Sequence, residues 1–509
     1  MSPAPSVEPA PTDAPDLPEQ VQVRLDKYER LTADGRYPFP VHVDRTDDVA
    51  AVRAAHEGLE PDTHTGDVVG VAGRAMFIRN TGKLAFAALR DGEAEIQLML
   101  SLDAVGAESL AAWKADVDLG DLVWAHGEVI TSRRGELSVL VDRWEIAAKA
   151  LRPLPVAHKE LSEDTRMRQR YVDLIMSPEA RGLVRTRATV LHSLRDTLDR
   201  RDYVELETPI LQSVHGGAAA RPFRTHVNAF DTEVTLRIAT ELFLKRAVVG
   251  GISRVYEIGK TFRNEGIDST HSAEFTMLEA YEAYGDYDTM ATLTRDLVVD
   301  AASALGLSEV LAYSAGGPVP IDITGEWRHA TVFELVSDAI GDDIDIDTDV
   351  EVLRRHAAAR DVELQPQWDA GEIVLELYEK LVERTLLQPT FVRDYPVSVR
   401  PLARRHRDDP RLAEAWDLVV GGVELAPAYS ELNDPVDQRR RLVQQSLAAA
   451  AGDPEAMELD EDFLRALEYG MPPTGGMGMG VDRLIMVLTG RSIRETILFP
   501  MVRPEPPRH

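Results

Sequence analysis

The chain has 509 residues, of which 44% are hydrophobic and 28% are charged, and its formal net charge is -30. This length predicts two or three domains, and the composition is that of a globular protein. No apolar run reaches the roughly 18 to 20 residues that span a bilayer, and the first residues lack the order of a signal peptide. We therefore expect a cytoplasmic protein with no membrane partner, and with no DNA partner because the negative charge disfavours nonspecific polyanion binding. Cysteine is absent, so catalysis must use carboxylates, His, Lys, Arg, hydroxyls or a bound metal.

The N-terminal part of the chain changes character twice. Residues 1–20, MSPAPSVEPAPTDAPDLPEQ, are rich in Pro and acidic residues, and this composition predicts a disordered tail. From about Asp67 to Lys149, short alternating segments are separated by Gly or charged turns. Five strands at this spacing suit a small barrel of the oligonucleotide-binding (OB) type, although any small all-β module fits the periodicity about as well. We assign residues 21–150 to this unit.

Residues 151–509 are predicted to form an α+β domain with an antiparallel sheet, because their strands are separated by long, irregular intervals rather than by regular βαβ units. An apolar stripe through Leu191, Leu194 and Leu198 has helical spacing, and DYVELETPIL after it alternates as a strand. A second helical region follows further along, and then a less regular span that ends at about Leu387. This part of the chain contains no internal repeat.

The stretch TFRNEGIDSTHSAEF joins two strand-like segments, RVYEIGKTFRNE and AEFTMLEAYEAY, through a polar loop. At the strand end, the Arg263 guanidinium can bind a phosphate or a carboxylate through two parallel hydrogen bonds. Glu265 can accept from an exocyclic amine, and Phe275 can stack on a purine. These features indicate a nucleotide site built without a Walker loop, although a solvated hairpin with an ordinary Arg and Glu pair fits the spacing at least as well.

Two further patterns carry charged side chains. GGMGMGVDRLIMVLTG places close glycines before a helix that presents Arg483 near its N-terminal end, where the helix dipole favours an anion. Asp417 and Glu424 stand seven residues apart across a strand bend and could hold Mg²⁺ against a triphosphate. Each pattern alone is more often a surface Arg or a pair of solvated carboxylates. The acidic run from Asp342 lacks the Gly and the Glu that a calcium loop requires, so we interpret it as a solvated loop.

Taken in this order, the segments resemble the class II aminoacyl-tRNA synthetases, and within them the lysyl-tRNA synthetase family, from about Gln20 to Pro504. The long helix and its strand resemble the first class motif, FRNEGIDSTHSAEF the second and GMGMGVDRL the third. GGAAARPFRTHVNAF, TELFLKRAVVGG, EFTMLEAYEAYGDY and YSELNDPVDQR are similar to lysyl-specific segments. The resemblance implies a class II catalytic domain with an antiparallel sheet, preceded by an OB-fold barrel that binds the anticodon of tRNA(Lys).

The resemblance also implies the reaction and its site residues. The activity is ATP-dependent activation of L-lysine to lysyl-adenylate and transfer to tRNA, with ATP and Mg²⁺ as cofactors and a homodimer as the assembly. The implied ATP-binding residues are Arg263, Glu265, His271, Phe275 and Arg483, of which Arg263 and Arg483 are also catalytic. The implied Mg²⁺ ligands are Asp417 and Glu424, although the family more usually has Glu at the first position. The implied anticodon-binding residues are Arg79, Phe86, Gln97 and Glu136.

The implied lysine pocket is supported by a charge argument. A lysine ammonium that leaves water needs anionic or neutral acceptors, and the matching positions supply Glu279, Tyr281 and Glu431. Glu241 and Gly217 are placed for the α-amino group. Aspartyl and asparaginyl enzymes share the fold, but an aspartate side chain would require cations where these carboxylates stand. Lysine is therefore the better substrate.

One segment departs from the family. The usual ELANGFSELND is ELAPAYSELND here, so the Asn that helps to hold the substrate carboxylate is Pro427, and the Gly after it is Ala428. Proline has neither a side-chain donor nor a backbone N–H. Three functions remain open: a lysine-tRNA ligase, an enzyme of the same chemistry whose product or altered amino acid serves another pathway, and a catalytically weak tRNA-binding regulator. Intact Arg263, Glu265 and Arg483 disfavour the third.

Overall fold

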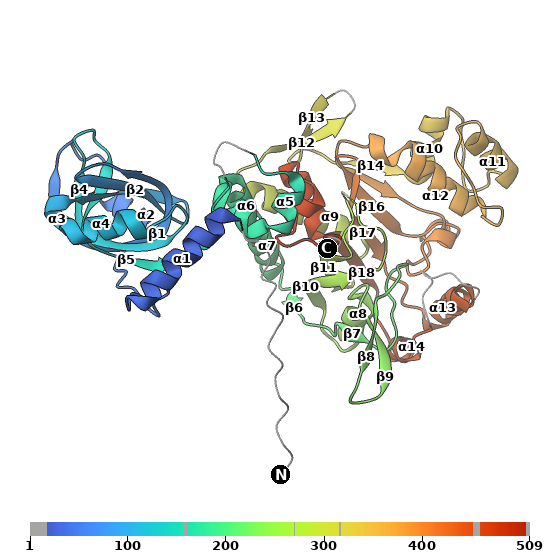
Figure 1. Cartoon of the computed structure of the whole chain (residues 1–509). Helices are drawn as coiled ribbons and strands as arrows, with labels where there is room; N and C mark the ends of the chain where they lie inside the picture. The colour runs from blue at the N-terminus through green and yellow to red at the C-terminus, as the bar shows by residue number, and fades with distance from the viewer. Residues whose placement is uncertain (1–17, 156–159, 269, 315–316, 451–458, 505–509) are drawn as a thin grey trace, which may run out of the picture. The chain divides into compact units, whose positions relative to one another are not determined.

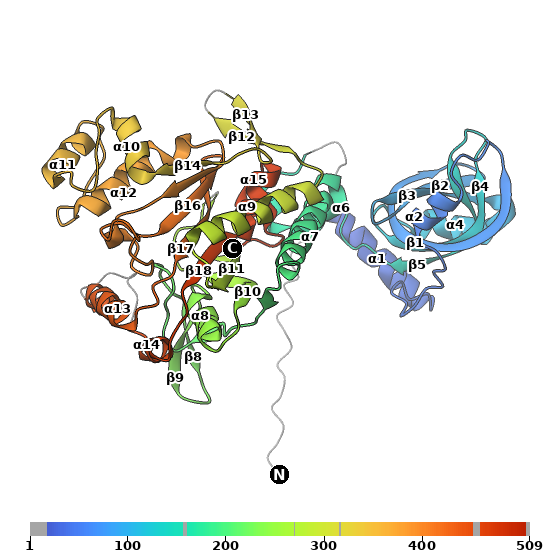
Figure 2. The ribbon, with the colours of Figure 1, turned by 180° about the vertical axis from the view of Figure 1, so that it is seen from behind.

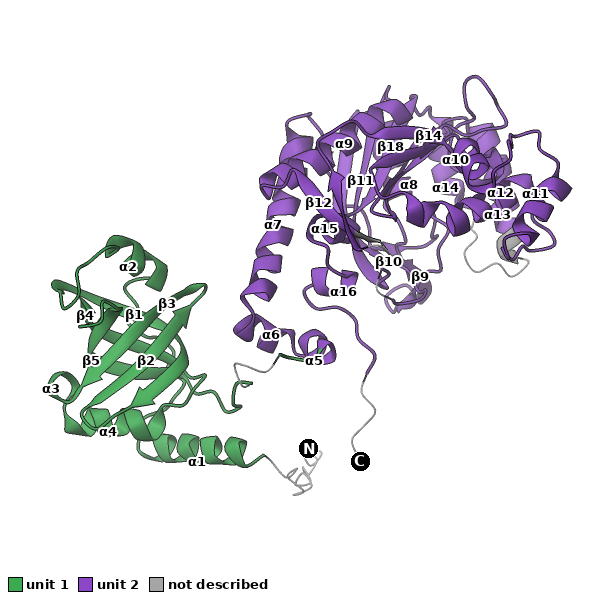
Figure 3. Ribbon diagram, turned by 90° about the horizontal axis from the view of Figure 1, so that it is seen from above, with its two compact units in different colours: residues 1–162 green, residues 163–509 purple. Residues whose placement is uncertain are grey.

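The computed structural model describes residues 18–155, 160–268, 270–314, 317–450 and 459–504. The chain forms two units, Met1–Ser162 and Glu163–His509 (Figure 3). The predicted tail lies largely outside the described residues, and its last two residues already belong to helix α1 (Glu19–Ala33). No helix in the described ranges combines the length and the apolar character that crossing a bilayer needs.

The first unit is a closed five-stranded barrel with strand order β1-β2-β3-β5-β4, which confirms the predicted OB-type barrel (Figure 1). Its strands are β1 (His64–Asn80), β2 (Leu84–Asp91), β3 (Ala94–Ser101), β4 (Leu122–Thr131) and β5 (Leu137–Ala148). Its other helices are α2 (Val49–Ala55), α3 (Leu102–Val105) and α4 (Ala107–Asp116). Alternate residues of β2, Ala85, Ala87 and Leu89, are buried in the barrel, so the residues between them face outward. Trp113 of α4 packs edge-on against Trp144, with 5.2 Å between ring centroids.

The second unit is built on an eight-stranded sheet with strand order β14-β15-β16-β17-β18-β11-β10-β6. Its strands are β6 (Val204–Glu205), β10 (Arg254–Phe262), β11 (Glu274–Ala283), β14 (Arg328–Thr331), β15 (Thr390–Arg393), β16 (Ala415–Val420), β17 (Val423–Ser430) and β18 (Thr474–Gly480). The central pairs from β15 to β10 are antiparallel, whereas β6 and β14 join the two edges in parallel. This architecture confirms the predicted α+β class.

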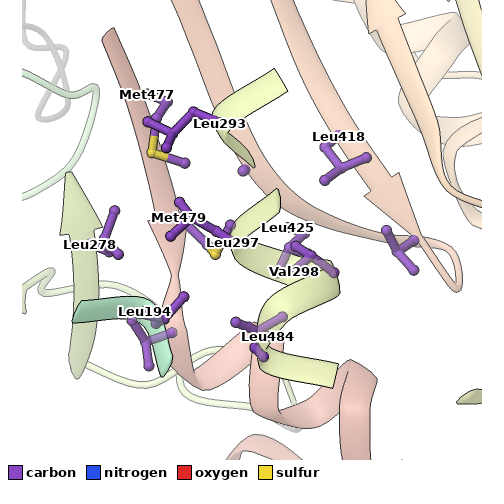
Figure 4. Close-up of a cluster of buried hydrophobic side chains, with 14 of the residues drawn as sticks. Leu194, Leu278, Leu293, Leu297, Val298, Leu418, Leu425, Met477, Met479 and Leu484 are labelled. Atoms are coloured by element: carbon purple, nitrogen blue, oxygen red, sulfur yellow. The ribbon is translucent and has the colours of Figure 1, made fainter. Parts of the chain in front are cut away.

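Helices α7 (Pro178–Asp199), α9 (Tyr287–Ala304) and α15 (Val481–Thr489) cover one face of the sheet (Figure 2). Leu194 of α7, Leu297 of α9 and Leu484 of α15 meet Met479 of β18 in a fully buried cluster (Figure 4). Each fully buried side chain of this kind contributes about 1.5 to 3 kcal/mol. The predicted apolar stripe of α7 therefore packs within its own unit, with Leu198 also fully buried.

The remaining elements surround the sheet. One small sheet has the strand order β7 (Leu211–Gln212), β9 (Thr232–Leu236) and β8 (Arg224–Val227). Another consists of β12 (Glu309–Ser314) and β13 (Gly317–Asp322). Further helices are α5 (Glu163–Arg168), α6 (Arg170–Met176), α8 (Glu241–Val249), α10 (Val332–Ile340), α11 (Val350–Ala358), α12 (Ala370–Leu381), α13 (Pro435–Ala450), α14 (Glu461–Glu468) and α16 (Ile493–Thr496). Two short 3₁₀ helices cover Glu383–Thr385 and Val397–Val399.

Two predicted segments differ from the structure. The strand expected over DYVELETPIL is reduced to β6, because the Thr208 backbone N–H donates to the Glu257 carboxylate at 3.0 Å instead of to a neighbouring strand. The span described as less regular contains β12 to β14 and helices α10 to α12, so that prediction is wrong. Thr331 and Asp369 are the N-caps of α10 and α12, and both form capping boxes. A capping box is a local sequence signal for a helix start, and it was available here in addition to the helical spacing.

The acidic run after Asp342 forms a loop whose carboxylates bind their own backbone. Asp345 accepts from the backbone N–H of Asp347 at 3.0 Å, and Asp349 caps α11 by accepting from Glu351 N–H at 2.8 Å. Among the residues with described positions, no group of three or more His, Asp or Glu side chains is placed to hold a metal ion. The loop is thus a capping and turn segment.

Candidate functional site

The face of the sheet opposite the helices carries a pocket of about 710 Å³. Period-two alternation along β18 explains it: Met477 and Met479 face the helices, whereas Gly476, Gly478 and Gly480 face the pocket. A Cβ on Gly476 would stand 2.0 Å from a carboxylate oxygen of Glu431. Only glycine fits there, so the strand floor lies directly against the side chains of the pocket.

The hairpin of β10 and β11 forms one wall of the pocket. The backbone N–H of Arg263 donates to the Ala273 carbonyl at 2.9 Å, which holds the first loop residue after β10 in the hairpin. The Arg263 guanidinium carbon lies 5.3 Å from the ring centroid of Phe275. Its Nε is buried and has no hydrogen-bond partner among the described residues. Arg263 thus presents an unsatisfied cation beside an aromatic ring.

The loop of this hairpin meets the helix after β18. His271 Nδ1 lies 3.0 Å from the Asp268 carboxylate, and its Nε2 lies 3.4 Å from Arg483 Nη2. Arg483, in the first turn of α15, donates to the Glu424 carbonyl at 2.8 Å. Glu265 accepts from the backbone N–H of Arg221 at 3.1 Å. All five residues predicted for ATP line this one pocket: Arg263, Glu265, His271, Phe275 and Arg483.

A second group of side chains forms the most deeply buried part of the pocket. The residues predicted for lysine are Gly217, Glu241, Glu279, Tyr281 and Glu431, and all of them line it. Glu279 accepts from the backbone N–H of Thr240 at 2.9 Å and from the Tyr281 hydroxyl at 3.1 Å. Burial raises the pKa of Glu279 to about 7, although the two donors favour its charged form. A cation next to this carboxylate would therefore be bound strongly.

Lys245 belongs to the same cluster, and the sequence analysis missed it. Its ammonium is fully buried, 2.6 Å from Glu241 Oε1 and 2.5 Å from Glu431 Oε2. Burial opposes the charge, but the two carboxylates outweigh it and raise the pKa of Lys245. Lys245 stands four residues after Glu241 on α8, so the i, i+4 spacing within TELFLKR was the available signal.

The charges of this cluster can be counted. Glu241, Glu279 and Glu431 supply three carboxylates, and Lys245 supplies one ammonium. With all four ionised, the cluster carries two negative charges in a water-poor pocket. This number matches a ligand with two ammonium groups and disfavours one with an acidic side chain, because unpaired buried charges are costly.

The two predicted metal ligands have different surroundings. Asp417 of β16 is buried, and its Oδ2 lies 2.5 Å from Arg400 Nη2. The Glu424 side chain of β17 is 42% exposed, and its carboxylate lies 3.9 Å from Arg483 Nη1. Burial and the charge of Glu424 raise the pKa of nearby Glu383 to about 7. Glu424 is therefore more open to a cation, because its ion pair with Arg483 is long and partly exposed, whereas Asp417 is buried against Arg400.

Pro427 lies directly opposite Asp417 in the ladder between β16 and β17. It lines the pocket, as the family position requires, but its ring offers no hydrogen-bond donor. Arg400, which also lines the pocket, donates from Nη2 to the Asp417 carboxylate at 2.5 Å. No sequence pattern indicates Arg400 as a pocket residue, because it lies in an irregular segment after the 3₁₀ helix Val397–Val399.

The residues predicted for the anticodon lie in the barrel. Arg79 faces Phe86 across β1 and β2, with its guanidinium carbon 5.0 Å from the ring centroid. Phe86 is half-buried on the outer surface, between the buried Ala85 and Ala87. Gln97 of β3 donates to the Ser138 hydroxyl of β5 at 2.9 Å. Glu136 is exposed in the turn before β5. These positions place Arg79, Phe86 and Gln97 on the outer surface of adjoining strands.

Comparison with protein-family models matches residues 162–503 to tRNA synthetases class II (D, K and N). Residues 69–147 match the OB-fold nucleic acid binding domain. The antiparallel sheet, its pocket and the barrel therefore define a class II tRNA synthetase with an OB-fold domain.

Curated relatives narrow the family. The chain is 56% identical over 503 residues to Lysine-tRNA ligase of Mycobacterium bovis, covering 96% of this chain and 98% of that protein. It is 55% identical over 491 residues to Lysine-tRNA ligase of Kineococcus radiotolerans, with the same two coverages. The chain belongs to the lysine-tRNA ligase family. It is also 51% identical over 491 residues to the Lysylphosphatidylglycerol biosynthesis bifunctional protein LysX of Mycobacterium marinum, covering 96% of this chain but 44% of that protein.

Proposed function

We propose that the protein activates L-lysine with ATP to lysyl-adenylate and transfers the lysyl group to the 3′ end of tRNA(Lys) in the cytoplasm. The observation that carries this proposal is the buried cluster of three carboxylates and one ammonium beside the Arg263 and Arg483 side of the same pocket. Membership of the lysine-tRNA ligase family supports the same reaction. No protein nucleophile is needed, because the substrate carboxylate is itself the attacking group.

In the first step, a lysine carboxylate oxygen attacks the α-phosphate in line, and pyrophosphate leaves. We assign Arg263 to the charge on the α-phosphate and Arg483 to the γ-phosphate, with His271 as a further phosphate contact. Phe275 stacks on the adenine, and Glu265 accepts from its amine. Glu424, the more exposed of the two carboxylates, would hold Mg²⁺, which would neutralise phosphate charge when bound. Catalysis here is positioning plus electrostatics.

The amino acid occupies the buried end of the pocket. We assign Glu279, Tyr281 and Glu431 to the ε-ammonium, and Glu241 with Gly217 to the α-ammonium. Gly217 has φ +87, and a Cβ there would stand 3.0 Å from the Glu241 Cβ, so glycine keeps this side of the pocket clear. The two ammonium groups of lysine balance the two net charges of the cluster, which is the physical basis of selection against aspartate.

Pyrophosphate exchange with each standard amino acid tests the proposal. We expect L-lysine to support exchange far better than any other amino acid, because its two ammonium groups balance the two negative charges of the cluster and membership of the lysine-tRNA ligase family points to the same substrate. Exchange driven by another amino acid would refute the lysine assignment. A protein that exchanges with none, yet binds tRNA, would instead be the weak regulator.

A second candidate function uses the same product outside translation. The observation that favours it is the similarity to LysX, which covers 96% of this chain but only 44% of that protein. Pro427 in place of the family Asn is compatible with this role, since a slower or altered activation would suffice. Replacing the lysine-tRNA ligase of a bacterial host with this chain separates the two: growth supports translation, and absence of growth despite lysine exchange supports the second function.

Anticodon recognition is proposed for the barrel surface around Arg79, Phe86, Gln97 and Glu136. Phe86→Ala should weaken tRNA charging by about 1 to 3 kcal/mol, because it removes a platform on which a base stacks. Adenylate formation should not change, since Phe86 lies in the other unit from the pocket. Aminoacylation and pyrophosphate exchange, measured side by side, check this. Phe230→Ala, at an exposed aromatic of the second unit, is the control, and equal losses in both assays would identify Phe86 as a stability residue.

We propose that the assembly is a homodimer formed at the edge strand β6. The stripe of α7 packs within the unit, but Val204 and Ile252 are exposed near this edge, and Tyr284 beside them is 81% exposed. Exposed apolar groups beside an unpaired strand edge favour association with a second copy. Light scattering at micromolar concentration should give twice the mass of one chain, and Val204→Asp should halve it. A monomeric parent would refute the homodimer.

A further inference from the structure

The ion pair between Arg400 and Asp417 lies in the nucleotide side of the pocket and has no role in the function proposed above. Arg400 Nη2 and Asp417 Oδ2 are 2.5 Å apart, and the Arg400 side chain is only 17% exposed. Both residues line the pocket. In the family pattern, Asp417 is one of two carboxylates assigned to Mg²⁺. A guanidinium therefore already stands where that assignment requires a metal ion.

The structure holds Arg400 in this position from several sides. Its guanidinium carbon lies 4.0 Å from the ring centroid of Tyr395, which is itself fully buried. The backbone next to it is anchored by Arg441, whose Nη1 donates to the carbonyl of Ala403 at 2.9 Å. Rotating Arg400 away would leave the buried Asp417 carboxylate without its cation, and an unpaired buried charge is strongly unfavourable.

With Arg400 in place, the surroundings of Asp417 offer little to a metal ion. Asp417 is one methylene shorter than the Glu that the family more usually has at this position, so it reaches less far into the pocket. Directly opposite it stands Pro427, which supplies no side-chain oxygen. The second carboxylate, Glu424, has a different environment, because it is partly exposed and not paired with Arg400. The two positions are therefore not equivalent toward a cation.

We propose that Arg400 takes the place of a divalent cation at Asp417, so that the nucleotide is held with a protein-borne positive charge there and with metal at Glu424 only. Arg400 is on this account a positioning residue for the reaction: it neutralises Asp417 and contributes a fixed charge beside the phosphates. The inference rests on the proposed use of ATP. It predicts a site that needs fewer divalent cations than a pair of free carboxylates would.

The test counts Mn²⁺ ions bound with a non-hydrolysable ATP analogue by electron paramagnetic resonance, which does not depend on turnover. Asp417→Asn should leave the number and affinity of bound Mn²⁺ unchanged within about twofold, whereas Glu424→Gln should weaken Mn²⁺ binding by about tenfold or more. Arg400→Gln should add a Mn²⁺ ion, since it frees the Asp417 carboxylate. The double variant Arg400→Gln with Asp417→Asn should lose that added ion.

Controls keep the outcomes separate. Arg405→Gln is the control, because this guanidinium is not part of the Arg400–Asp417 pair and instead donates to the Pro410 carbonyl at 2.8 Å. This variant should bind Mn²⁺ as the parent does. The double variant removes both members of the pair together, so it remains informative if Asp417→Asn alone does not fold. Loss of a Mn²⁺ ion in folded Asp417→Asn, or no added ion in Arg400→Gln, overturns the inference. Neither result contradicts the proposed function, lysine activation with ATP. A parent that binds no ATP analogue overturns both the inference and the proposed function.

Discussion

Glu279→Gln is expected to raise the KM for lysine by roughly 30- to 5000-fold while the KM for ATP stays within about twofold. The variant keeps the shape and one acceptor oxygen but removes the charge that we assign to the ε-ammonium of the substrate. Removing one partner of a desolvated, hydrogen-bonded charge pair costs about 2 to 5 kcal/mol, which sets this range. Pyrophosphate exchange at varied lysine and ATP concentrations measures both constants.

The same carboxylate predicts a pH dependence. Because burial raises the pKa of Glu279 to about 7, the empty pocket is partly protonated near neutral pH. Lysine requires the ionised form, so its affinity should rise as the pH increases through about 7, and the rise should continue toward 8 because burial also raises the pKa of Glu431 to about 8. Glu279→Gln should lose the part of the rise near pH 7 and keep the part that belongs to Glu431. The control is Glu274→Gln on the same strand, where the carboxylate is exposed and pairs with Lys260 at 3.5 Å. A Glu279→Gln enzyme that activates lysine as the parent does would remove Glu279 from the pocket assignment.

Lys245→Met is expected to lower the free energy of unfolding by about 3 to 5 kcal/mol, because it leaves Glu241 and Glu431 as buried carboxylates without their shared cation. Denaturant unfolding, followed by tryptophan fluorescence, measures the loss. Adding Glu431→Gln to the variant should recover part of it, since one unpaired charge is removed. Free lysine should also stabilise the variant by supplying an ammonium to the same carboxylates.

The matched control for this prediction is Lys380→Met. The Lys380 side chain is 60% exposed and pairs with Glu376 at 3.5 Å, so the same substitution there should cost at most about 0.5 kcal/mol. If Lys245→Met costs no more than this control, the ammonium does not hold the pocket together. In that case, the charge count that favours lysine as the substrate would have to be revised.

Much of the fold could be predicted from local pattern. Alternation over residues 67–149 predicted the five barrel strands, and the polar loop between two alternating segments predicted the hairpin that carries Arg263 and Phe275. These features depend on residues close together in sequence, because the spacing of apolar residues along a segment determines which of its faces is buried. The strand at β6 was overestimated because Glu257, distant in sequence, takes the backbone N–H of Thr208.

The composition of the pocket was only partly predictable. The residues named for ATP and lysine stand in segments with a recognisable pattern, and the structure brings them into one pocket. Glu383 and Arg400 have no such signal, because each meets its partner only through packing of separate elements. Lys245 has the i, i+4 spacing to Glu241 as a signal, but that helix face fits a solvent-exposed ion pair equally well. Charge balance in a buried site is a tertiary property, and a single sequence does not display it.

Strand β18 has the hydrophobic core on one face and the pocket on the other, and its residues alternate between the two faces. Its methionines fill the helix-packed core, and its glycines give room to Glu431 and to the ligand side of the sheet. Inserting one residue into this strand would move methionine side chains into the pocket and leave glycines as voids under α9, so it would damage stability and binding at once. The length of β18 can therefore change only in steps of two, and a protein engineer who alters either the pocket floor or the core beneath it must treat both as one site.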